Sequence, residues 1–158
     1  MSPKLDDLQS VYASMEAFCN AVPKEYINVL AVFDNEEVGS RTRQGADSTL
    51  LSGTLSRICA SLGYTEAQLV QGITESFMVS ADNAQGFHPN HPELSDEGNN
   101  VKLNQGVVIK FNAAQSYTSD SFSSCVLKCL AEKANVPVQI YTNRSDQRGG
   151  GTLGNVSN

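Results

Sequence analysis

Hydrophobic residues recur along the chain in two patterns, one with the period of a helix and one made of short continuous runs. The helical spacing predicts four amphipathic helices, over residues 5–22, 47–63, 64–76 and 118–135. The continuous apolar runs, each bounded by polar residues, predict four buried strands, over residues 26–33, 77–82, 106–112 and 137–143. Residues 83–105 lack any periodicity, and we expect a long loop there.

Strands that alternate with helices are typical of an α/β domain, and we predict a mostly parallel sheet flanked by helices on both faces. In such sheets, binding sites form at the carboxyl ends of the strands. The acidic turn 34–37 follows the first predicted strand, Asp82 ends the second, and Lys110 lies near the end of the third. Carboxylates that meet at one edge of a sheet can hold a cation, so the sequence predicts a metal cleft at this edge.

The predicted sheet is incomplete. The chain opens within a few residues of a helix and stops after a glycine-rich segment, without a closing strand or helix. A sheet built from these elements would expose an edge, which complete domains avoid or cover. We therefore expect the chain to be part of a longer protein.

Composition and charge argue against several classes of protein. Hydrophobic residues make up 40% and charged residues 18% of the 158 positions, as in an ordinary globular protein. The net charge is −6 and only residues 41–43 are locally basic, which argues against nucleic acid as a partner. No apolar run is long enough to cross a bilayer, and the N-terminus lacks the pattern of a signal segment. We therefore expect a cytoplasmic protein with no membrane partner.

The four cysteines, Cys19, Cys59, Cys125 and Cys129, each lie in an apolar, helix-like context. Cys125 and Cys129 are one helical turn apart, but no second pair and no nearby histidine completes a structural zinc site. We therefore expect reduced cysteines that pack in the core as small hydrophobic residues.

The acidic turn Asp34-Asn35-Glu36-Glu37 has the residue types of a hydrolytic metal site. Adjacent glutamates in extended backbone point to opposite sides, whereas a turn lets one bind a metal while the other faces the metal-bound water. The free carboxylate can then take the proton of that water and pass it to a leaving amine. Taken alone, however, this motif favours a solvated loop or a cap of the following helix.

Five segments, in this order along the chain, resemble the M18 family of metallopeptidases, the aspartyl aminopeptidases and their bacterial relatives. They are LDDLQSVYASMEAF, VFDNEEVGSRTRQGADSTLL, SADNAQGFHPNHPE, GVVIKFNAAQSYTSD and NRSDQRGGGTLGNVSN. The resemblance covers essentially the whole chain and implies a zinc-peptidase-like fold. It also implies a two-metal aminopeptidase that removes N-terminal residues, often acidic ones, from peptides. Family members are homo-oligomers with a second domain inserted in the chain.

The resemblance implies a role for each of four carboxylates. Asp6 matches the ligand that bridges both metals, and Glu36 matches the general base. Glu37 and Asp82 each match a ligand of one metal, which is zinc or, alternatively, manganese or cobalt. Structural roles are the alternatives: Asp6 or Asp7 as the N-cap of the following helix, and Asp82 as a turn residue at a strand end.

Lys110, Tyr117 and Gln85 match positions that contact the substrate in the family. A solvated lysine and a partly packed tyrosine are the ordinary alternatives for Lys110 and Tyr117. Gln85 stands where the family usually has histidine, and glutamine can donate a hydrogen bond but cannot carry a proton. Support for the transition state is therefore expected to be weaker there. For His88 we expect a hydrogen-bonded structural role, and for His91 only a loop position.

Two family segments that supply metal-binding histidines have no counterpart in this sequence. Each metal is therefore expected to lack one imidazole ligand, which lowers affinity. The inserted oligomerisation domain has no counterpart either, so we expect residues 1–158 to be a partial catalytic domain with reduced or no activity alone. The alternatives are a non-catalytic fragment or degenerate paralogue, and another two-metal hydrolase such as an M42-type peptidase.

Overall fold

Helix α1 (Leu5–Asn20) belongs to the first of two compact units, into which the chain divides between Ala81 and Asp82 in the computed structural model. The structure describes residues 3–144, 146, 150, 153 and 156. Regular helical turns begin only after Asp7, because Asp6 (φ −86°, ψ 111°) and Asp7 (φ −115°, ψ 23°) lie outside the helical region. The helix predicted over residues 5–22 is confirmed.

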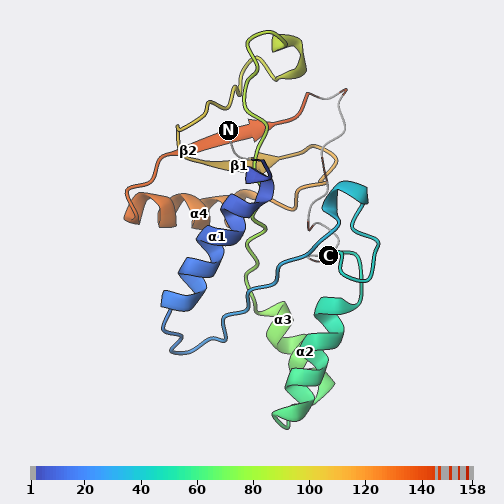
Figure 1. Cartoon of the computed structure of the whole chain (residues 1–158). Helices are drawn as coiled ribbons and strands as arrows, with labels where there is room; N and C mark the ends of the chain where they lie inside the picture. Colours follow the sequence, from blue (N-terminus) through green and yellow to red (C-terminus); the bar gives the residue numbers. More distant parts are fainter. Residues whose placement is uncertain (1–2, 145, 147–149, 151–152, 154–155, 157–158) are drawn as a thin grey trace. The chain divides into compact units, whose positions relative to one another are not determined.

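Helices α2 (Leu50–Ser61) and α3 (Glu66–Thr74) lie side by side as a helical hairpin (Figure 1). Gly63, with φ +83°, ends the first helix in the left-handed conformation that glycine favours. Thr65 caps the second, since its hydroxyl accepts from the backbone N–H of Gln68 and its own N–H donates to the Gln68 side chain. Both helices match the elements predicted from hydrophobic spacing.

The apolar runs 26–33 and 77–82 do not form strands in the described residues. Their side chains are largely exposed, as at Ile27 (81%) and Val79 (62%). An apolar run indicates a segment that is suited to burial, but a strand also needs a neighbouring strand to pair its backbone N–H and C=O groups. Neither run has such a neighbour among the described residues, so these two strand predictions are wrong for this structure.

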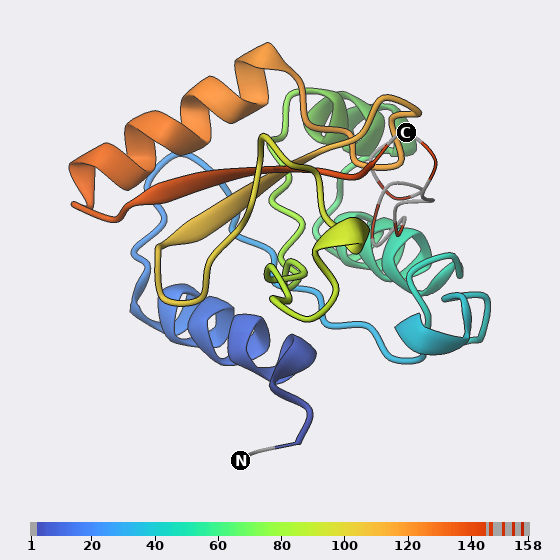
Figure 2. The same ribbon diagram turned by 90° about the horizontal axis from the view of Figure 1, so that it is seen from above.

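The second unit contains strands β1 (Val107–Phe111) and β2 (Val138–Thr142), joined by helix α4 (Ser121–Lys133). The strands pair in parallel, with Lys110 of β1 opposite Tyr141 of β2 (Figures 1 and 2). Parallel strands require a long crossover, and α4 with its flanking turns supplies it. This arrangement confirms the predicted α/β class with a parallel sheet and flanking helices.

Local sequence determines where these elements start. Asp120 caps α4, because its carboxylate accepts a 2.7 Å hydrogen bond from the backbone N–H of Ser123. Gly106 precedes β1 at φ +102°, where a Cβ would lie 2.0 Å from the carbonyl oxygen of Pro137. Only glycine fits at that approach. Ile109 of β1, at 4% exposure, is among the few buried side chains.

The cysteines carry no disulfide, as expected, but their predicted burial is wrong. Cys19, Cys125 and Cys129 are exposed and Cys59 is half-buried. On α4 the buried positions are Ser124 and Ala131, so the cysteines lie on the other sides of that helix. Apolar context predicted a helix correctly but did not identify its buried face.

The helices are short relative to a bilayer. Among the described residues the longest helix, α1, has 16 residues, whereas a span needs about 20 apolar ones. No helix in the described part of the chain is long and apolar enough to cross a membrane.

Candidate metal and substrate site

The acidic turn folds into a short 3-10 helix, Glu36–Val38 (η1), rather than an open loop. Asn35 (φ 62°) precedes it and Gly39 (φ 95°) follows it, both in left-handed conformations. Successive side chains of a 3-10 helix diverge by about 120°. Glu36 and Glu37, both exposed, therefore leave this turn in different directions. This geometry is what two adjacent carboxylates with separate roles require.

Backbone and side-chain hydrogen bonds hold the acidic turn closed. The amide of Asn35 donates to the Thr42 hydroxyl at 2.8 Å, and the backbone N–H of Asp47 donates to the Ser40 carbonyl at 3.0 Å. Gly45 is buried against this closure, and a Cβ there would lie 2.0 Å from the Ser40 carbonyl oxygen. The turn is therefore a packed structure whose glycine cannot be replaced without a backbone shift.

Asp6 lies in the same unit as the acidic turn, near the start of α1. Its side chain is exposed, while that of Asp7 is half-buried. Lys4, in a left-handed conformation, occupies the N-cap position and makes no side-chain cap bond. A capping role for Asp6 thus receives no support from the structure.

Asp82 and Lys110 meet in the second unit, where they form a short ion pair. The Lys110 Nζ lies 2.6 Å from Asp82 Oδ2 and 2.8 Å from the carbonyl oxygen of Asn83. The side chains are 14% exposed for Lys110 and 23% for Asp82, so water screens this pair only in part. Charge-assisted hydrogen bonds of this length are among the stronger polar contacts in proteins. Lys110 is therefore not the solvated strand-end lysine that the sequence left open.

Two tyrosines lie close to this ion pair. Lys110 Nζ is 5.5 Å from the ring centroid of Tyr117, within cation–π range. Burial raises the pKa of the Tyr117 hydroxyl, and the nearby Tyr141 and Asp82 raise it further. Burial also raises the pKa of Tyr141, which sits opposite Lys110 in the strand register. The structure thus brings together three of the residues predicted for the site: Asp82, Lys110 and Tyr117.

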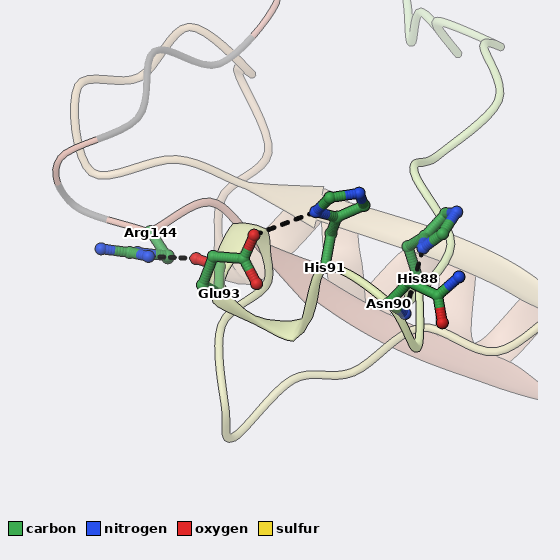
Figure 3. Close-up of polar contacts among 5 residues, drawn as sticks. All are labelled: His88, Asn90, His91, Glu93 and Arg144. Carbon is green, nitrogen blue, oxygen red and sulfur yellow. Dashed lines mark hydrogen bonds and ion pairs between the residues drawn. The ribbon is translucent and has the colours of Figure 1, made fainter.

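Gln85 and the two histidines belong to the loop that begins after Asp82. Gln85 is exposed. The His88 Nδ1 accepts a 3.2 Å hydrogen bond from the Asn90 backbone N–H, in line with its expected structural role (Figure 3). His91 pairs with the Glu93 carboxylate at 3.1 Å through its own Nδ1, so it does more than fill a loop position.

Residues of β2 and of the segment after it form hydrogen bonds to the loop of residues 83–105. The sequence did not predict these contacts. The Gln139 side chain bonds to both the N–H and the C=O of Lys102, at 2.9 and 3.0 Å. Thr142 accepts from Asn99 at 3.3 Å, and Arg144 donates to the backbone carbonyl of Glu93 (Figure 3). The one available signal was polar Gln139 between two apolar residues of β2.

The donor groups fit a divalent cation. Asp82 is a half-buried carboxylate that pairs with the ammonium of Lys110, and its oxygens are of the kind that divalent metals accept. The first unit offers Asp6, Glu36 and Glu37, whose carboxylate oxygens are hard ligands of the kind that divalent metals accept. Each unit, taken by itself, therefore supplies carboxylate oxygens of the kind that a metal site uses.

Comparison with known proteins identifies the family. The family model described as aminopeptidase I zinc metalloprotease (M18) matches residues 1–158. The chain belongs to the M18 family. A divalent metal is therefore part of the chemistry of its family, as the description of the family states.

Curated relatives of this M18 chain include the "Probable M18 family aminopeptidase 2" of Clostridium novyi, which is 49% identical over 156 residues. The protein of the same name from Mycobacterium tuberculosis strain H37Rv is 36% identical over 157 residues. These alignments cover 99% and 97% of the M18 chain but only 36% of each relative. The chain thus spans about a third of the length of these relatives.

Solved structures of M18 aminopeptidases share its fold. An M18 aminopeptidase from Thermotoga maritima matches with a TM-score of 0.81 at 25% identity, over 96% of this chain and 35% of the other. Yeast aminopeptidase 1 matches with a TM-score of 0.77 at 26% identity, over 99% and 36%. The predicted zinc-peptidase-like fold agrees with both similarities.

Proposed function

We propose that this M18 chain carries part of the catalytic site of a metal-dependent aminopeptidase, which removes N-terminal residues from peptides. The observation that carries the proposal is the family match over residues 1–158 together with the paired Asp82 and Lys110. The relatives that it matches are named aminopeptidases. The missing histidine segments and Gln85 fit the alternative of a non-catalytic fragment or degenerate paralogue, whereas no observation favours an M42-type hydrolase.

The carboxylates take separate roles in this proposal. Asp6, Glu37 and Asp82 would hold two divalent ions, most readily zinc, with manganese or cobalt as alternatives. When bound, such ions lower the pKa of a coordinated water and stabilise the negative charge of the transition state. Glu36 takes a proton from the attacking water and passes it to the leaving amine. The divergence of Glu36 from Glu37 on η1 supports this division.

In this proposal, residues of the second unit contact the substrate. The proximity of the Lys110 ammonium to Asp82 and to the Tyr117 ring supports a role for Lys110 and Tyr117 in binding polar atoms of a peptide. A cation there favours acidic N-terminal residues over basic ones. Gln85 contributes a neutral hydrogen-bond donor, which supports a developing negative charge less than a protonated imidazole does.

We assign no histidine of this chain to the metal, and we propose that the protein assembles with copies of itself. The chain has only two histidines, and His88 and His91 are both engaged within the loop. We therefore assign neither to the metal, and each ion receives fewer protein ligands and weaker binding from this chain. One structural relative is described as the dodecamer of yeast mApe1. By analogy, we propose that this chain belongs to a homo-oligomer.

Metal binding is the primary test, because it does not require full activity. The wild-type chain, Asp82→Asn and Glu37→Gln are titrated with Zn²⁺ or Mn²⁺ by calorimetry. We expect both variants to bind metal more weakly by about tenfold or more, because each loses a charged ligand. Glu132→Gln on the exposed part of α4 is the matched control for loss of one negative charge. Equal metal affinity in the wild type and both ligand variants would refute the assignment of Asp82 and Glu37 as metal ligands.

Hydrolysis of aminoacyl p-nitroanilides tests the assigned base. Glu36→Gln should keep the metal affinity of the wild type but lower any hydrolysis rate by about 10²- to 10⁴-fold, the usual contribution of a general base. An aspartyl substrate should be cleaved faster than a lysyl one. Unchanged hydrolysis in Glu36→Gln would refute the role of this residue.

A further inference from the structure

Lys110 has its positive charge beside the carboxylate of Asp82, which the proposed function assigns as a metal ligand. Its Nζ lies 2.6 Å from Asp82 Oδ2, closer than it lies to the Asn83 carbonyl oxygen. A divalent cation bound by Asp82 and an ammonium bound to the same carboxylate would repel each other at short range. The two cations therefore compete for Asp82.

The position of Lys110 is fixed by more than the ion pair. Its ammonium also donates to the Asn83 carbonyl at 2.8 Å, and it lies 5.5 Å from the centre of the Tyr117 ring. The backbone of Lys110 is paired in β1 opposite Tyr141, so only its side chain can move. With 14% exposure, this side chain has little contact with water. The ion pair therefore persists as a defined alternative to a bound metal.

We infer that Lys110 is the internal counter-ion of Asp82 in the metal-free protein, and that metal binding displaces its ammonium. The displaced ammonium can then form a cation–π interaction with the nearby ring of Tyr117. Metal loading thereby releases Lys110, which can then bind an acidic group of a substrate. This inference rests on the proposed function, because it takes Asp82 as a metal ligand. It makes metal binding the step that opens the anion-binding position.

Metal affinity tests the competition directly. Zn²⁺ alone is titrated into the wild-type chain, Lys110→Met, Lys110→Gln and Asp82→Asn by calorimetry. Because the competing charge-assisted hydrogen bond is lost, we expect Lys110→Met to bind zinc about tenfold more tightly than the wild type. Lys110→Gln, which keeps a hydrogen-bond donor without the charge, should also bind more tightly. Lys128→Met, at an exposed position of α4, is the control for the change in net charge and should match the wild type.

The direction of the change separates this role from a structural one. A variant that merely unfolds or loosens the site loses metal affinity, so tighter binding cannot arise from damage. Weaker or equal binding in both Lys110 variants, with Asp82→Asn still impaired, overturns the inference but leaves the metal site intact. If Asp82→Asn binds zinc as well as the wild type, the proposed function fails at this ligand, and the inference fails with it.

Chemical labelling provides a second readout. The chain is treated with an amine-acylating reagent with and without Zn²⁺, and labelling of Lys110 is followed by peptide mass spectrometry. We expect slow labelling of Lys110 without metal, because its ammonium is bound to Asp82 and Asn83, and faster labelling with metal. Asp82→Asn should show fast labelling in both conditions. If zinc binds the wild type but labelling of Lys110 stays the same, the displacement does not occur.

Discussion

Replacing Gly45 by alanine tests whether the acidic turn is a packed structure. A Cβ at this position would lie 2.0 Å from the Ser40 carbonyl oxygen, whereas real Cβ atoms essentially never come within 3.0 Å of a neighbour. The backbone must therefore shift by about 1 Å, which lengthens the hydrogen bond from Asp47 N–H to Ser40 O beyond bonding distance. Loss of this bond and the strain of the shift together cost about 2–3 kcal/mol.

Urea unfolding followed by circular dichroism measures this cost. We expect Gly45→Ala to lower the free energy of unfolding and to weaken zinc binding, because Glu36 and Glu37 are presented by the same turn. Gly53→Ala is the matched control, since Gly53 lies within α2 with no atom near the added methyl group. That change should stabilise the helix by about 0.5–1 kcal/mol. If Gly45→Ala unfolds at the same urea concentration as the wild type, the close packing against Ser40 is refuted.

Two further predictions concern the second unit. Ile109→Ala removes a side chain with 4% exposure from β1 and should cost about 2–4 kcal/mol in urea unfolding, while Val107→Ala, at 44% exposure, should cost less than about 1 kcal/mol. Equal costs would contradict the difference in burial between these two positions of β1. The raised pKa values of Tyr117 and Tyr141 mean that the folded state holds these protons more tightly than the unfolded state. The free energy of unfolding should therefore fall as pH rises above 10.0, the ordinary pKa of tyrosine. Tyr117→Phe and Tyr141→Phe should each reduce this slope, and an unchanged slope in both would show that neither proton is linked to folding.

Local patterns in the sequence predicted the helices well. Helices α2 and α3 follow from apolar spacing, and the structure adds Gly63 as the stop of α2 and Thr65 as the cap of α3, all of which act within a few residues. Asp82 and Lys110 were predicted to share one edge of the sheet and do meet, but residues 77–82 do not form the strand on which that prediction depended. Their catalytic and metal-binding roles stay predictions.

The pattern of apolar and polar residues could not predict which residues far apart in the sequence contact each other. The run 26–33 is apolar enough for a strand, yet no neighbour pairs with it in the described residues. The ion pair of Lys110 with Asp82 and the contacts of Gln139 with Lys102 join residues far apart along the chain. A side chain's own sequence context does not reveal which distant group it will reach, so these contacts emerged only from the structure.

The hydrogen bonds that attach the loop between Asp82 and β1 to β2 and Arg144 affect the order of folding. Its anchors on Gln139, Thr142 and Arg144 close segments of 37, 43 and 51 residues. Closing such long segments carries an entropy cost that must be met before the contacts form. We therefore expect the loop to become ordered after β2 has docked on β1. Amide hydrogen exchange should accordingly find loop amides that open without global unfolding, while those shared by β1 and β2 exchange last.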